Sequence, residues 1–547
     1  MSQSIQTAIA LHQKGELSKA KLIYQSLLVD KDSIQVHYLL GLLLSQLKDY
    51  KKAIDHLERA AATQKHNPDW YNALAICYQK CNMPKTALKF IKIAHGLNPS
   101  HPNYVNRYCK ILNDNQYYQE SIDIMLNFLT TTNTFPEGYI TLSISLKVSN
   151  KPFEACKALI KALRLFPNNS KIGFNLADAF VQVGRFKAAI PLLNQLIDNN
   201  LETTDALTLK AIIKREKREF NEAIKLAKQA LEISPNNVSA QWNLGLSLLL
   251  TKNYGEGWKR YDTGFLVGQR QACKLPLPIW RGEPLQGKHI LVAGEQGLGD
   301  QVMFTSHLNV LQELGAKVTL SCEPRLLELF KNSFKDIHVI ESKSLNNCIA
   351  LQHDFMIVVG SIYPVLSQLD VPMSPKKAYL FCQNTKPINS NKLKVGFSWK
   401  GGANLKDNRK RSVDLKHWLE LLSYKDVELF CLQHKLSDRE ENILSRNAQI
   451  NLLEGISSDN DIDQLIYTIS QMDLVITVDN TVAHFAGALG IDTWCLIPFS
   501  PDWRWGHEGY ANIWYKSVQL VRQKTAYNWH QALKEIKTKL TNKISNT

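Results

Sequence analysis

The residues with the strongest chemical character follow a short apolar run near the end of the chain. Residues 474–478 predict a buried strand, and the next three are all good helix N-cap residues, namely Asp479, Asn480 and Thr481. A helix in residues 482–489 would present its first free backbone N–H groups, and the positive end of its dipole, at the end of that strand. Because such a helix entrance binds anions, the segment predicts a phosphate-binding site.

The helix itself carries small residues and a single histidine. His484 lies one turn inside it, within reach of an anion bound by the amides of Thr481, Val482 and Ala483. Gly487 and the neighbouring alanines leave room for close packing against a sheet or a ligand. A core histidine that bonds a carbonyl group explains the same pattern, but a polar strand end beside an apolar strand favours a site.

A glycine-rich turn near the middle of the chain, GEQGLGD, is the second candidate. Gly294, Gly297 and Gly299 stand between a predicted strand and a helix that Asp300 opens. Doubly wound folds bind their ligands at such carboxyl ends of strands. The spacing is GxxGxG, however, and does not match the GxGxxG of dinucleotide-binding turns. On spacing alone, Asp300 is best explained as a helix N-cap.

The third candidate is a basic segment, VGFSWKGGANLKDNRKRSVDL, that continues from a predicted strand. Lys400 comes directly after the strand, and Lys406, Arg409, Lys410 and Arg411 follow. Basic side chains at the carboxyl end of a strand can neutralise a diphosphate. A solvated basic loop is the better explanation for Lys406 and Arg409. The pattern does not choose which of the other cations would contact a ligand.

All three candidates lie in the second half of the chain, where short apolar runs alternate with amphipathic helices. That alternation predicts parallel sheets of the doubly wound kind, and about 270 residues suffice for two of them. The Pro-, Asn- and Lys-rich stretch 384–393 predicts the boundary between the two sheets. The predicted strands are 290–293, 317–321, 338–341, 355–359, 394–399, 429–432, 474–478 and 493–497.

The first half of the chain repeats with a period of 34 residues. One series of small residues is Ala20, Ala53, Ala87, Ser121, Ala155, Ala189, Ala223 and Gly257, and a second is Gly41, Ala75, Cys109, Ser143, Ala177, Ala211 and Gly245. Small side chains at fixed intervals mark places where two helices approach closely. The pattern resembles the tetratricopeptide repeat, a helix-turn-helix unit that stacks into a superhelix with a protein-binding concave face.

Composition sets the class of protein. With 44% hydrophobic and 21% charged residues, no run of 18 apolar residues and no signal-peptide pattern at the N-terminus, the chain reads as a cytoplasmic protein without a membrane span. Its ten cysteines include no CxxC pair, which favours reduced thiols.

The positive charge is unevenly placed. The net charge is +15, and residues 1–270 hold 34 Lys and Arg against 22 Asp and Glu. This excess suits an acidic protein or an anionic surface, although a solvated surface explains it more simply. Because base-reading motifs and zinc-finger spacings are missing, we expect no nucleic-acid partner.

Four motifs that follow the repeats carry a resemblance to a known family. They are GEQGLGDQVMF, VGFSWKGG with RKRS, DLVITVDNTVAHFAGALG and PFSPDWRWG. With the repeats, they look like bacterial tetratricopeptide-repeat glycosyltransferases, whose catalytic half is related to the heptosyltransferases that build lipopolysaccharide. The plan is also similar to that of the protein O-GlcNAc transferase and of flagellin glycosyltransferases. The resemblance covers essentially the whole chain.

The resemblance implies an α-solenoid followed by two Rossmann-like α/β domains of the GT-B type. The implied domains are a repeat superhelix of about eight units in residues 1–265, a linker in 266–288, an acceptor domain in 289–385 and a nucleotide-sugar-binding domain in 393–547. It also implies a reaction in the cleft between the two domains, with a nucleotide sugar as substrate and with neither a metal ion nor a cofactor.

Site residues follow from the resemblance by position. The aspartate of the family's Gly-Asp motif is Asp300, implied to be the general base on the acceptor. The family's donor motif corresponds to Asp479, Thr481 and His484, on the same helix as Gly487, and this chain departs from heptosyltransferases at Asn480 and Val482 within it. The family's basic residue is Lys400 or Arg411. Possible sugar contacts are Glu295, Gly299, Asp502 and Arg504, of which the last two lie in a PDWRW loop that is equally explained as a packing turn.

These observations predict a glycosyltransferase that modifies a protein, because a small acceptor would not need eight repeats. By resemblance only, flagellin is a candidate acceptor. One alternative is an enzyme with lipopolysaccharide or another glycan as acceptor. Another is a non-catalytic repeat scaffold, against which the retained Gly299-Asp300 and Asp479…His484 pairs speak.

Overall fold

The computed structural model describes most of the chain. The described residues are 3–30, 32–63, 66–271, 273, 275–345, 352–372, 374–382, 387–401, 410–421, 424–452 and 462–545. The chain forms two compact units, residues 1–202 and residues 203–547.

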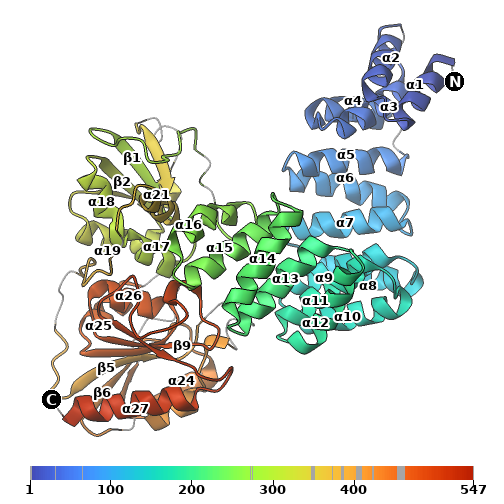
Figure 1. Cartoon of the computed structure of the whole chain (residues 1–547). Helices are drawn as coiled ribbons and strands as arrows, with labels where there is room; N and C mark the ends of the chain where they lie inside the picture. Colours follow the sequence, from blue (N-terminus) through green and yellow to red (C-terminus); the bar gives the residue numbers. More distant parts are fainter. Residues whose placement is uncertain are drawn as a thin grey trace. The chain divides into compact units, whose positions relative to one another are not determined.

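The first unit consists of helices that pack against one another in chain order (Figure 1). They are α1 (Gln3–Gln13), α2 (Leu17–Asp30), α3 (Ile34–Gln46), α4 (Tyr50–Thr63), α5 (Pro68–Lys80), α6 (Pro84–Leu97), α7 (Pro102–Asp114), α8 (Tyr118–Thr131), α9 (Pro136–Val148), α10 (Pro152–Leu165), α11 (Ser170–Gln182) and α12 (Phe186–Asp198). The expected α-solenoid of tetratricopeptide helices is therefore confirmed.

The repeated small residues lie where neighbouring helices touch, as expected. Seven of the eight members of the first series have no exposed surface, and the eighth, Gly257, is buried. A Cβ atom on Gly41 would lie 2.7 Å from Cγ of Leu57, and one on Gly257 would lie 2.8 Å from Cγ of Leu249. A larger residue at these positions would push the helices apart.

A second repeating feature appears only in the backbone. Between the two helices of successive repeats, one residue has a positive φ of 60° to 76°, and these residues recur every 34 positions. This left-handed residue ends the first helix of the repeat and lets its last carbonyl groups find partners. Glycine is the residue type that usually marks a positive φ, but only one of these seven residues is a glycine. The sequence therefore did not predict the left-handed turn. They are Lys48, Asn82, Gln116, Asn150, Gly184, Arg218 and Lys252.

The second unit begins with four more helices of the repeat and continues into the two sheets. These helices are α13 (Thr203–Glu216), α14 (Phe220–Ile233), α15 (Val238–Leu250) and α16 (Tyr254–Tyr261). Leu249, Trp258 and Tyr261 belong to the same buried core as Val292 of the first sheet and Val475 of the second. The last two repeats are therefore packed into the unit that carries the candidate site.

The first sheet has four parallel strands in the order β3-β2-β1-β4. The strands are β1 (His289–Ala293), β2 (Lys317–Cys322), β3 (His338–Glu341) and β4 (Phe355–Val358). The described helices that accompany them are α17 (Leu298–Phe304), α18 (Leu308–Glu313), α19 (Leu327–Ser333) and α21 (Ile362–Gln368).

The second sheet has six parallel strands in the order β10-β9-β8-β5-β6-β7. The strands are β5 (Leu393–Ser398), β6 (Val427–Cys431), β7 (Ile450–Leu452), β8 (Leu474–Val478), β9 (Thr493–Ile497) and β10 (Val518–Arg522). The described helices are α23 (Leu415–Leu421), α24 (Asp438–Ser445), α25 (Asp463–Ser470), α26 (Thr481–Leu489) and α27 (His530–Ser545).

All eight predicted strands are present within one or two residues of the expected bounds, and the prediction of two parallel sheets is confirmed. The sequence missed β7, which is only three residues long, and β10, which alternates buried and exposed residues at one sheet edge. In each sheet the chain starts in an inner strand and reverses direction next to it, at β1/β4 and at β5/β8. Ligands of open parallel sheets bind at such a reversal, beyond the carboxyl ends of the strands.

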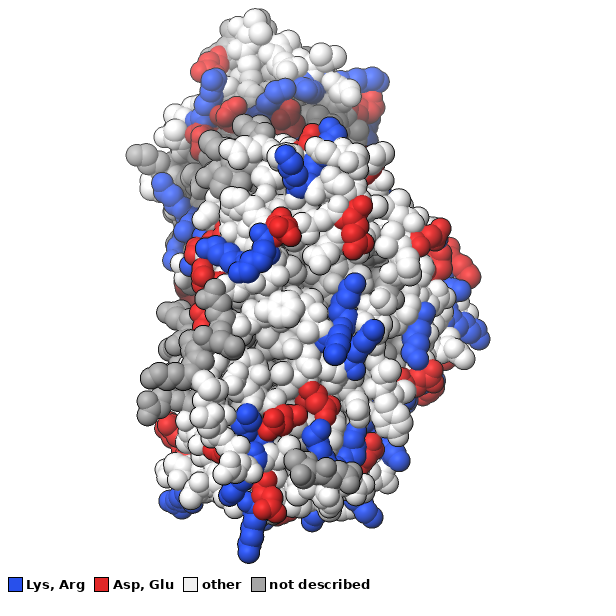
Figure 2. Space-filling model, turned by 90° about the vertical axis from the view of Figure 1, so that its left-hand side faces the viewer, with Lys and Arg blue, Asp and Glu red and all other residues white. Residues whose placement is uncertain are grey.

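The surface of the second unit carries charges of both signs. On the face drawn in Figure 2, the coloured Lys and Arg side chains alternate with Asp and Glu, and they form no large area of one sign. Within the described residues, no helix has the length and apolar character needed to cross a membrane.

Candidate functional site

Asn480 organises the end of β8. It is the N-cap of α26, since its Oδ1 accepts a hydrogen bond from the amide of Val482 at 3.0 Å. Its Nδ2 donates to Oγ of Ser398 at 2.9 Å and to the carbonyl oxygen of Lys400 at 3.0 Å. The same side chain therefore begins a helix and fastens β8 to the end of β5, where the order of the strands reverses.

The expected free amides at the start of α26 are largely occupied. The amide of Val482 donates to the Asn480 side chain, and the amide of Ala483 donates to the Asn480 carbonyl oxygen at 3.1 Å. The expectation of three free N–H groups is therefore wrong for two of them. The third amide of the expected set belongs to Thr481, the first residue of α26.

Asp479 is a buried carboxylate whose two oxygens have different partners. Only 3% of the residue is exposed, and its Oδ1 accepts a hydrogen bond from Nε1 of Trp505 at 2.6 Å. No described residue donates a hydrogen bond to its Oδ2, which lies 3.6 Å from Nη1 of Arg411 in an ion pair. Burial raises the pKa of Asp479, while the Arg411 charge opposes that rise. A ligand hydroxyl is the kind of donor that this oxygen lacks.

His484 is buried between aromatic rings. Its Nδ1 lies 2.9 Å from the hydroxyl of Tyr515, and its ring stacks on Trp505 with centroids 5.1 Å apart. Burial lowers the pKa of His484 to about 4, so the imidazole is neutral at pH 7. A Cβ atom on Gly299 would lie 2.8 Å from its Cδ2. The histidine therefore packs directly against the first helix of the other sheet.

Gly487 also serves packing. A Cβ atom there would lie 2.5 Å from the ring of Tyr515. The structure thus gives this glycine a contact with a tyrosine ring, which explains why α26 needs a residue without a side chain at that place.

Asp300 meets Arg504 across the two sheets. It lies in the first turn of α17, and its Oδ1 accepts a hydrogen bond from Nε of Arg504 at 2.8 Å and lies 2.5 Å from Nη2 of the same guanidinium in an ion pair. Its Oδ2 accepts a longer bond of 3.3 Å from the amide of Gly297. Spacing suggested that Asp300 is the N-cap, but the N-cap is Gly297 and Asp300 is the third residue of α17. Its carboxylate accepts from the N-cap amide and also faces the loop that follows β9.

Arg504 is held by a second carboxylate from its own loop. Its Nη1 donates to Oδ1 of Asp502 at 2.8 Å, its Nη2 donates to Gln296 at 3.2 Å, and its guanidinium lies over the Trp503 ring. Burial alone would lower the pKa of Arg504, but the charges of Asp300 and Asp502 raise it well above its ordinary value. The arginine is therefore a fixed cation between two carboxylates.

Residues from two other elements fasten the loop that carries Asp502 and Arg504. Arg218 of the repeat turn donates to the carbonyl oxygens of Phe499 at 3.3 Å and His507 at 2.7 Å. Arg522 of β10 donates to Trp505 and Gly506 at 2.7 and 3.0 Å. These bonds give hydrogen-bond partners to backbone carbonyl oxygens of a loop that lies outside the strands.

Glu295 lies in a buried ion pair with Arg270, which comes from the segment after α16. Both carboxylate oxygens accept from Arg270, with Nε at 3.1 and 3.2 Å and with a shorter contact from Nη2. Arg270 also donates to Ser361 at 2.9 Å and to Asp262 at 2.6 Å. The arginine thus fills the carboxyl ends of β1 and β4. In this arrangement Glu295 has no room for a sugar contact.

The structure separates the basic candidates. Nζ of Lys400 lies 2.6 Å from Oε2 of Glu440, and this contact, together with those from Ser437 and Trp399, holds the pKa of Glu440 at about 2 although burial acts against it. Lys400 therefore turns toward α24, whereas Arg411 lies beside Asp479. Lys410 points toward the repeats, with Nζ 3.1 Å from both Glu216 and Ser500. Lys406 and Arg409 lie outside the described residues.

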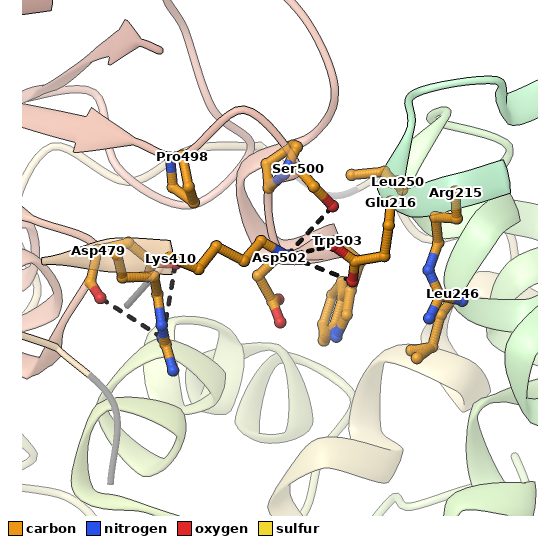
Figure 3. A pocket seen from close by; sticks show the side chains of 12 residues that line it. Arg215, Glu216, Leu246, Leu250, Lys410, Asp479, Pro498, Ser500, Asp502 and Trp503 are labelled. Atoms are coloured by element: carbon orange, nitrogen blue, oxygen red, sulfur yellow. Dashed lines mark hydrogen bonds and ion pairs between the residues drawn. The ribbon is translucent and has the colours of Figure 1, made fainter. Parts of the chain in front are cut away.

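A cavity of about 170 Å³ lies where these side chains meet the repeats (Figure 3). Arg411, Asp479 and Asp502 line it from the second sheet, and Arg215 and Glu216 line it from α13. Sequence reasoning missed the contribution of α13, because nothing in the repeat pattern sets Arg215 apart from other helix-surface cations. Its remaining lining residues are Leu246, Leu250, Lys410, Pro498, Ser500, Pro501 and Trp503.

The site can bind a polar ligand and transfer a proton. The cations beside Asp479 suit an anion at the second sheet, and Asp300 is a carboxylate in the helix that follows β1 of the first. Among the described residues, no group of three or more His, Cys, Asp or Glu side chains is arranged to hold a metal ion.

Comparison with known proteins identifies the repeats. Models of the tetratricopeptide repeat match residues 44–106, 174–237 and 208–257. The first half of the chain contains tetratricopeptide repeats. A tetratricopeptide-repeat protein from Parabacteroides merdae has a TM-score of 0.40 and 16% identity, and covers 45% of this chain and 97% of its own. PilF of Pseudomonas aeruginosa has a TM-score of 0.32 and 20% identity, with coverages of 38% and 95%.

One relative matches almost the whole chain. Protein FlbA of Caulobacter vibrioides is 24% identical over 527 residues, which are 90% of this chain and 88% of FlbA. Protein O-mannosyl-transferase TMTC3 is 24% identical over 264 residues in the human form and 29% identical over 263 in the mouse form. Each TMTC3 match covers 44% of this chain, and the chain spans only 29% of TMTC3.

Proposed function

We propose that this protein is a glycosyltransferase that moves a sugar from a nucleotide sugar to a hydroxyl group of a protein. One observation carries the proposal: Asp300, in the helix after β1, pairs with Arg504 of the loop after β9, and Trp505 of the same loop donates to the buried carboxylate of Asp479. A proton acceptor and a polar binding site thus come from different sheets and meet at their carboxyl ends, as a transfer between two bound substrates requires.

The proposed domain plan follows the GT-B arrangement. Residues 289–385 would form the Rossmann-like acceptor domain and 393–547 the Rossmann-like donor domain, with residues 1–265 as the repeat region and 266–288 as its linker. The donor diphosphate would lie near the start of α26, at Thr481, with Arg411 and Asp479 beside it. The orientation of Lys400 toward Glu440 favours Arg411 as the basic residue on the diphosphate.

The proposed chemistry gives Asp300 the role of general base. The acceptor O–H would lose its proton to a carboxylate oxygen of Asp300 as the acceptor oxygen forms a bond to the anomeric carbon. The bond between that carbon and the donor phosphate oxygen breaks, and the electron pair leaves on the nucleoside diphosphate. Oδ1 of Asp300 is engaged by Arg504, whereas Oδ2 accepts only the longer bond of 3.3 Å from the Gly297 amide and would be the proton acceptor.

The repeats and one relative support a protein acceptor. Tetratricopeptide repeats bind protein segments, and TMTC3 is named as a protein O-mannosyl-transferase. Because this chain spans only 29% of TMTC3, the name of that relative indicates a class of reaction to test and nothing more specific. A flagellin-like protein is the acceptor class to test first. For the location of the enzyme we propose the cytoplasm, where nucleotide sugars are available, and no cofactor.

The test is a transfer assay with intact mass detection. The purified protein is incubated with candidate acceptor proteins and each member of a nucleotide-sugar panel, and a mass gain of one hexose or amino sugar is expected for one pair. The absence of both donor hydrolysis and mass gain across the panel would refute the proposal. Transfer to a glycan but not to any protein would instead identify a glycan glycosyltransferase.

A further inference from the structure

The repeat helix α13 supplies a cation to the cavity beside Asp479. Arg215 is the penultimate residue of α13, and its Nη1 donates to the carbonyl oxygen and to Oδ1 of Asn243 on α15, both at 3.2 Å. Both bonds use one nitrogen. A guanidinium group has five N–H donors, so its other donors remain available toward the cavity that the side chain lines.

Arg215 differs from the other cations around this cavity. Lys410 pairs with Glu216, and Arg411 lies beside Asp479. Among the described residues, by contrast, Arg215 forms no ion pair, and only neutral oxygens of Asn243 accept its hydrogen bonds. Burial lowers the pKa of Arg215, while Glu216 and Asp502 oppose that effect from a distance. A partly buried arginine always keeps its charge, so a position without a carboxylate partner is costly unless an anion fills it.

The cavity offers a second unsatisfied group. Asp479 lines the same cavity, and its buried Oδ2 accepts no hydrogen bond from the residues that the structure describes. A cation without a paired carboxylate among the described residues, and a carboxylate oxygen whose partner is the more distant Arg411 charge, thus line one cavity. A phosphate group that carries a neighbouring hydroxyl satisfies both, because its oxygens accept from guanidinium and the hydroxyl donates to carboxylate. At about 170 Å³ the cavity admits only part of a nucleotide sugar.

We infer that the repeat array is itself part of the nucleotide-sugar site, and that Arg215 binds a phosphate group of the donor. This inference rests on the proposed function and adds a residue from outside the two sheets. It makes the last two repeats a component of donor binding, in addition to any role in holding an acceptor.

The experiment measures binding of nucleoside diphosphates to the full-length protein by calorimetry, with UDP, GDP, ADP and CDP as probes. The variant Arg215→Gln keeps hydrogen-bonding groups but removes the charge. Its matched control is Lys214→Gln, which removes a neighbouring cation of the same helix that pairs with Glu219. For the nucleotide that binds the native protein, we expect Arg215→Gln to raise Kd by roughly 10- to 100-fold, about 1.4–2.8 kcal/mol, and Lys214→Gln to leave it within about twofold.

The outcomes separate the two proposals. If the native protein binds one nucleotide and both variants bind it equally well, the role of Arg215 is refuted while the transferase proposal stands. If the native protein binds none of the four, the proposed function itself fails. Should Arg215→Gln not fold, Arg215→Lys keeps the charge but loses the planar fork, and we expect about 3- to 10-fold weaker binding. An unchanged Kd for Arg215→Lys would then overturn the inference.

Discussion

Arg504 and Asp300 lie 204 positions apart in the chain and form a polar contact between the elements of the two sheets, with Nη2 of the arginine 2.5 Å from Oδ1 of the aspartate. Both side chains are largely shielded, with 16% and 21% of their surfaces exposed. The aspartate begins the first helix of one sheet, and the arginine lies in the loop after a strand of the other. The contact therefore places the proposed base at the edge of the proposed donor site.

Replacing Asp300 by Asn tests the base directly. Asn keeps one oxygen, which can accept from Arg504 or from the Gly297 amide, and it cannot take a proton. We expect kcat for transfer to fall by roughly 10²- to 10⁴-fold. Donor Kd should change by less than about twofold, and the free energy of unfolding should fall by about 1 kcal/mol, since the amide weakens the ion pair. An Asp300→Asn enzyme with native kcat would leave Asp300 with only its capping and pairing roles.

Arg411→Gln and Lys400→Gln distinguish the two basic candidates. Arg411 lies beside Asp479, so its loss should weaken nucleotide binding by about 1–3 kcal/mol, the range for a charge-assisted hydrogen bond. Lys400 pairs with Glu440, so its loss should lower the unfolding free energy and leave nucleotide Kd unchanged. Calorimetry and urea denaturation of both variants make the comparison. The reverse pattern would assign the diphosphate to Lys400.

Gly299→Ala tests the close packing of α17 against His484. Its new Cβ would lie 2.8 Å from Cδ2 of the histidine, so the helices must separate, and we expect a loss of about 1–3 kcal/mol in unfolding free energy. Gly297→Ala is the matched control in the same turn. Its Cβ would come no closer than 3.5 Å to Oδ2 of Asp300, and its φ of −82° suits any residue. Equal stability of the two variants, measured by urea denaturation, would contradict the packing contact.

Two buried histidines predict a loss of stability in mild acid. Burial lowers the pKa of both His484 and His307 to about 4, and both titrate near 6.5 when unfolded. Between these values the unfolded chain binds more protons, so the unfolding free energy rises with pH. The stabilisation is complete above pH 6.5 and declines as pH falls to about 4. Each histidine contributes at most about 3 kcal/mol to the unfolding free energy in this way.

Urea denaturation between pH 7 and pH 4.5 measures this dependence. His307 is 2% exposed and its Nδ1 bonds Ser306 and Tyr363 at 3.0 and 2.7 Å. In His307→Asn the amide replaces Nδ1 without titrating, so the slope of unfolding free energy against pH should decrease in this window. A variant slope equal to that of the native protein would show that His307 does not contribute.

Truncation at two positions tests how the repeats join the sheets. A chain of residues 203–547 keeps the shared core of α15, α16 and both sheets, so we expect a cooperative thermal transition and retained nucleotide binding. A chain of residues 266–547 loses Trp258 and Tyr261, which pack on Trp503, and we expect it to aggregate or to unfold without a transition. Transfer to a protein should be lost in both. A stable 266–547 fragment would show that the sheets do not need the last repeats.

Periodicity determined much of this architecture from the sequence. The 34-residue recurrence of small residues predicted the helical repeats because close approach of two helices admits nothing larger, and Gly41 and Gly257 meet that condition. Apolar runs predicted eight of the ten described strands because a buried parallel strand has no polar face. The short β7 and the edge strand β10 were missed since neither carries that signal.

The sequence by itself also selected Asp300, Asp479, Asn480 and Arg504 as polar residues at strand ends, because local chemistry reveals N-caps and loop charges. Only the tertiary structure decided their partners. It paired Arg504 with Asp300, buried Glu295 under Arg270, turned Lys400 toward Glu440 and brought Arg215 from a repeat helix to the cavity beside Asp479. Each of these contacts joins residues at least 25 positions apart, and no local pattern encodes them. They depend on where the packing of one continuous core places the ends of separate elements.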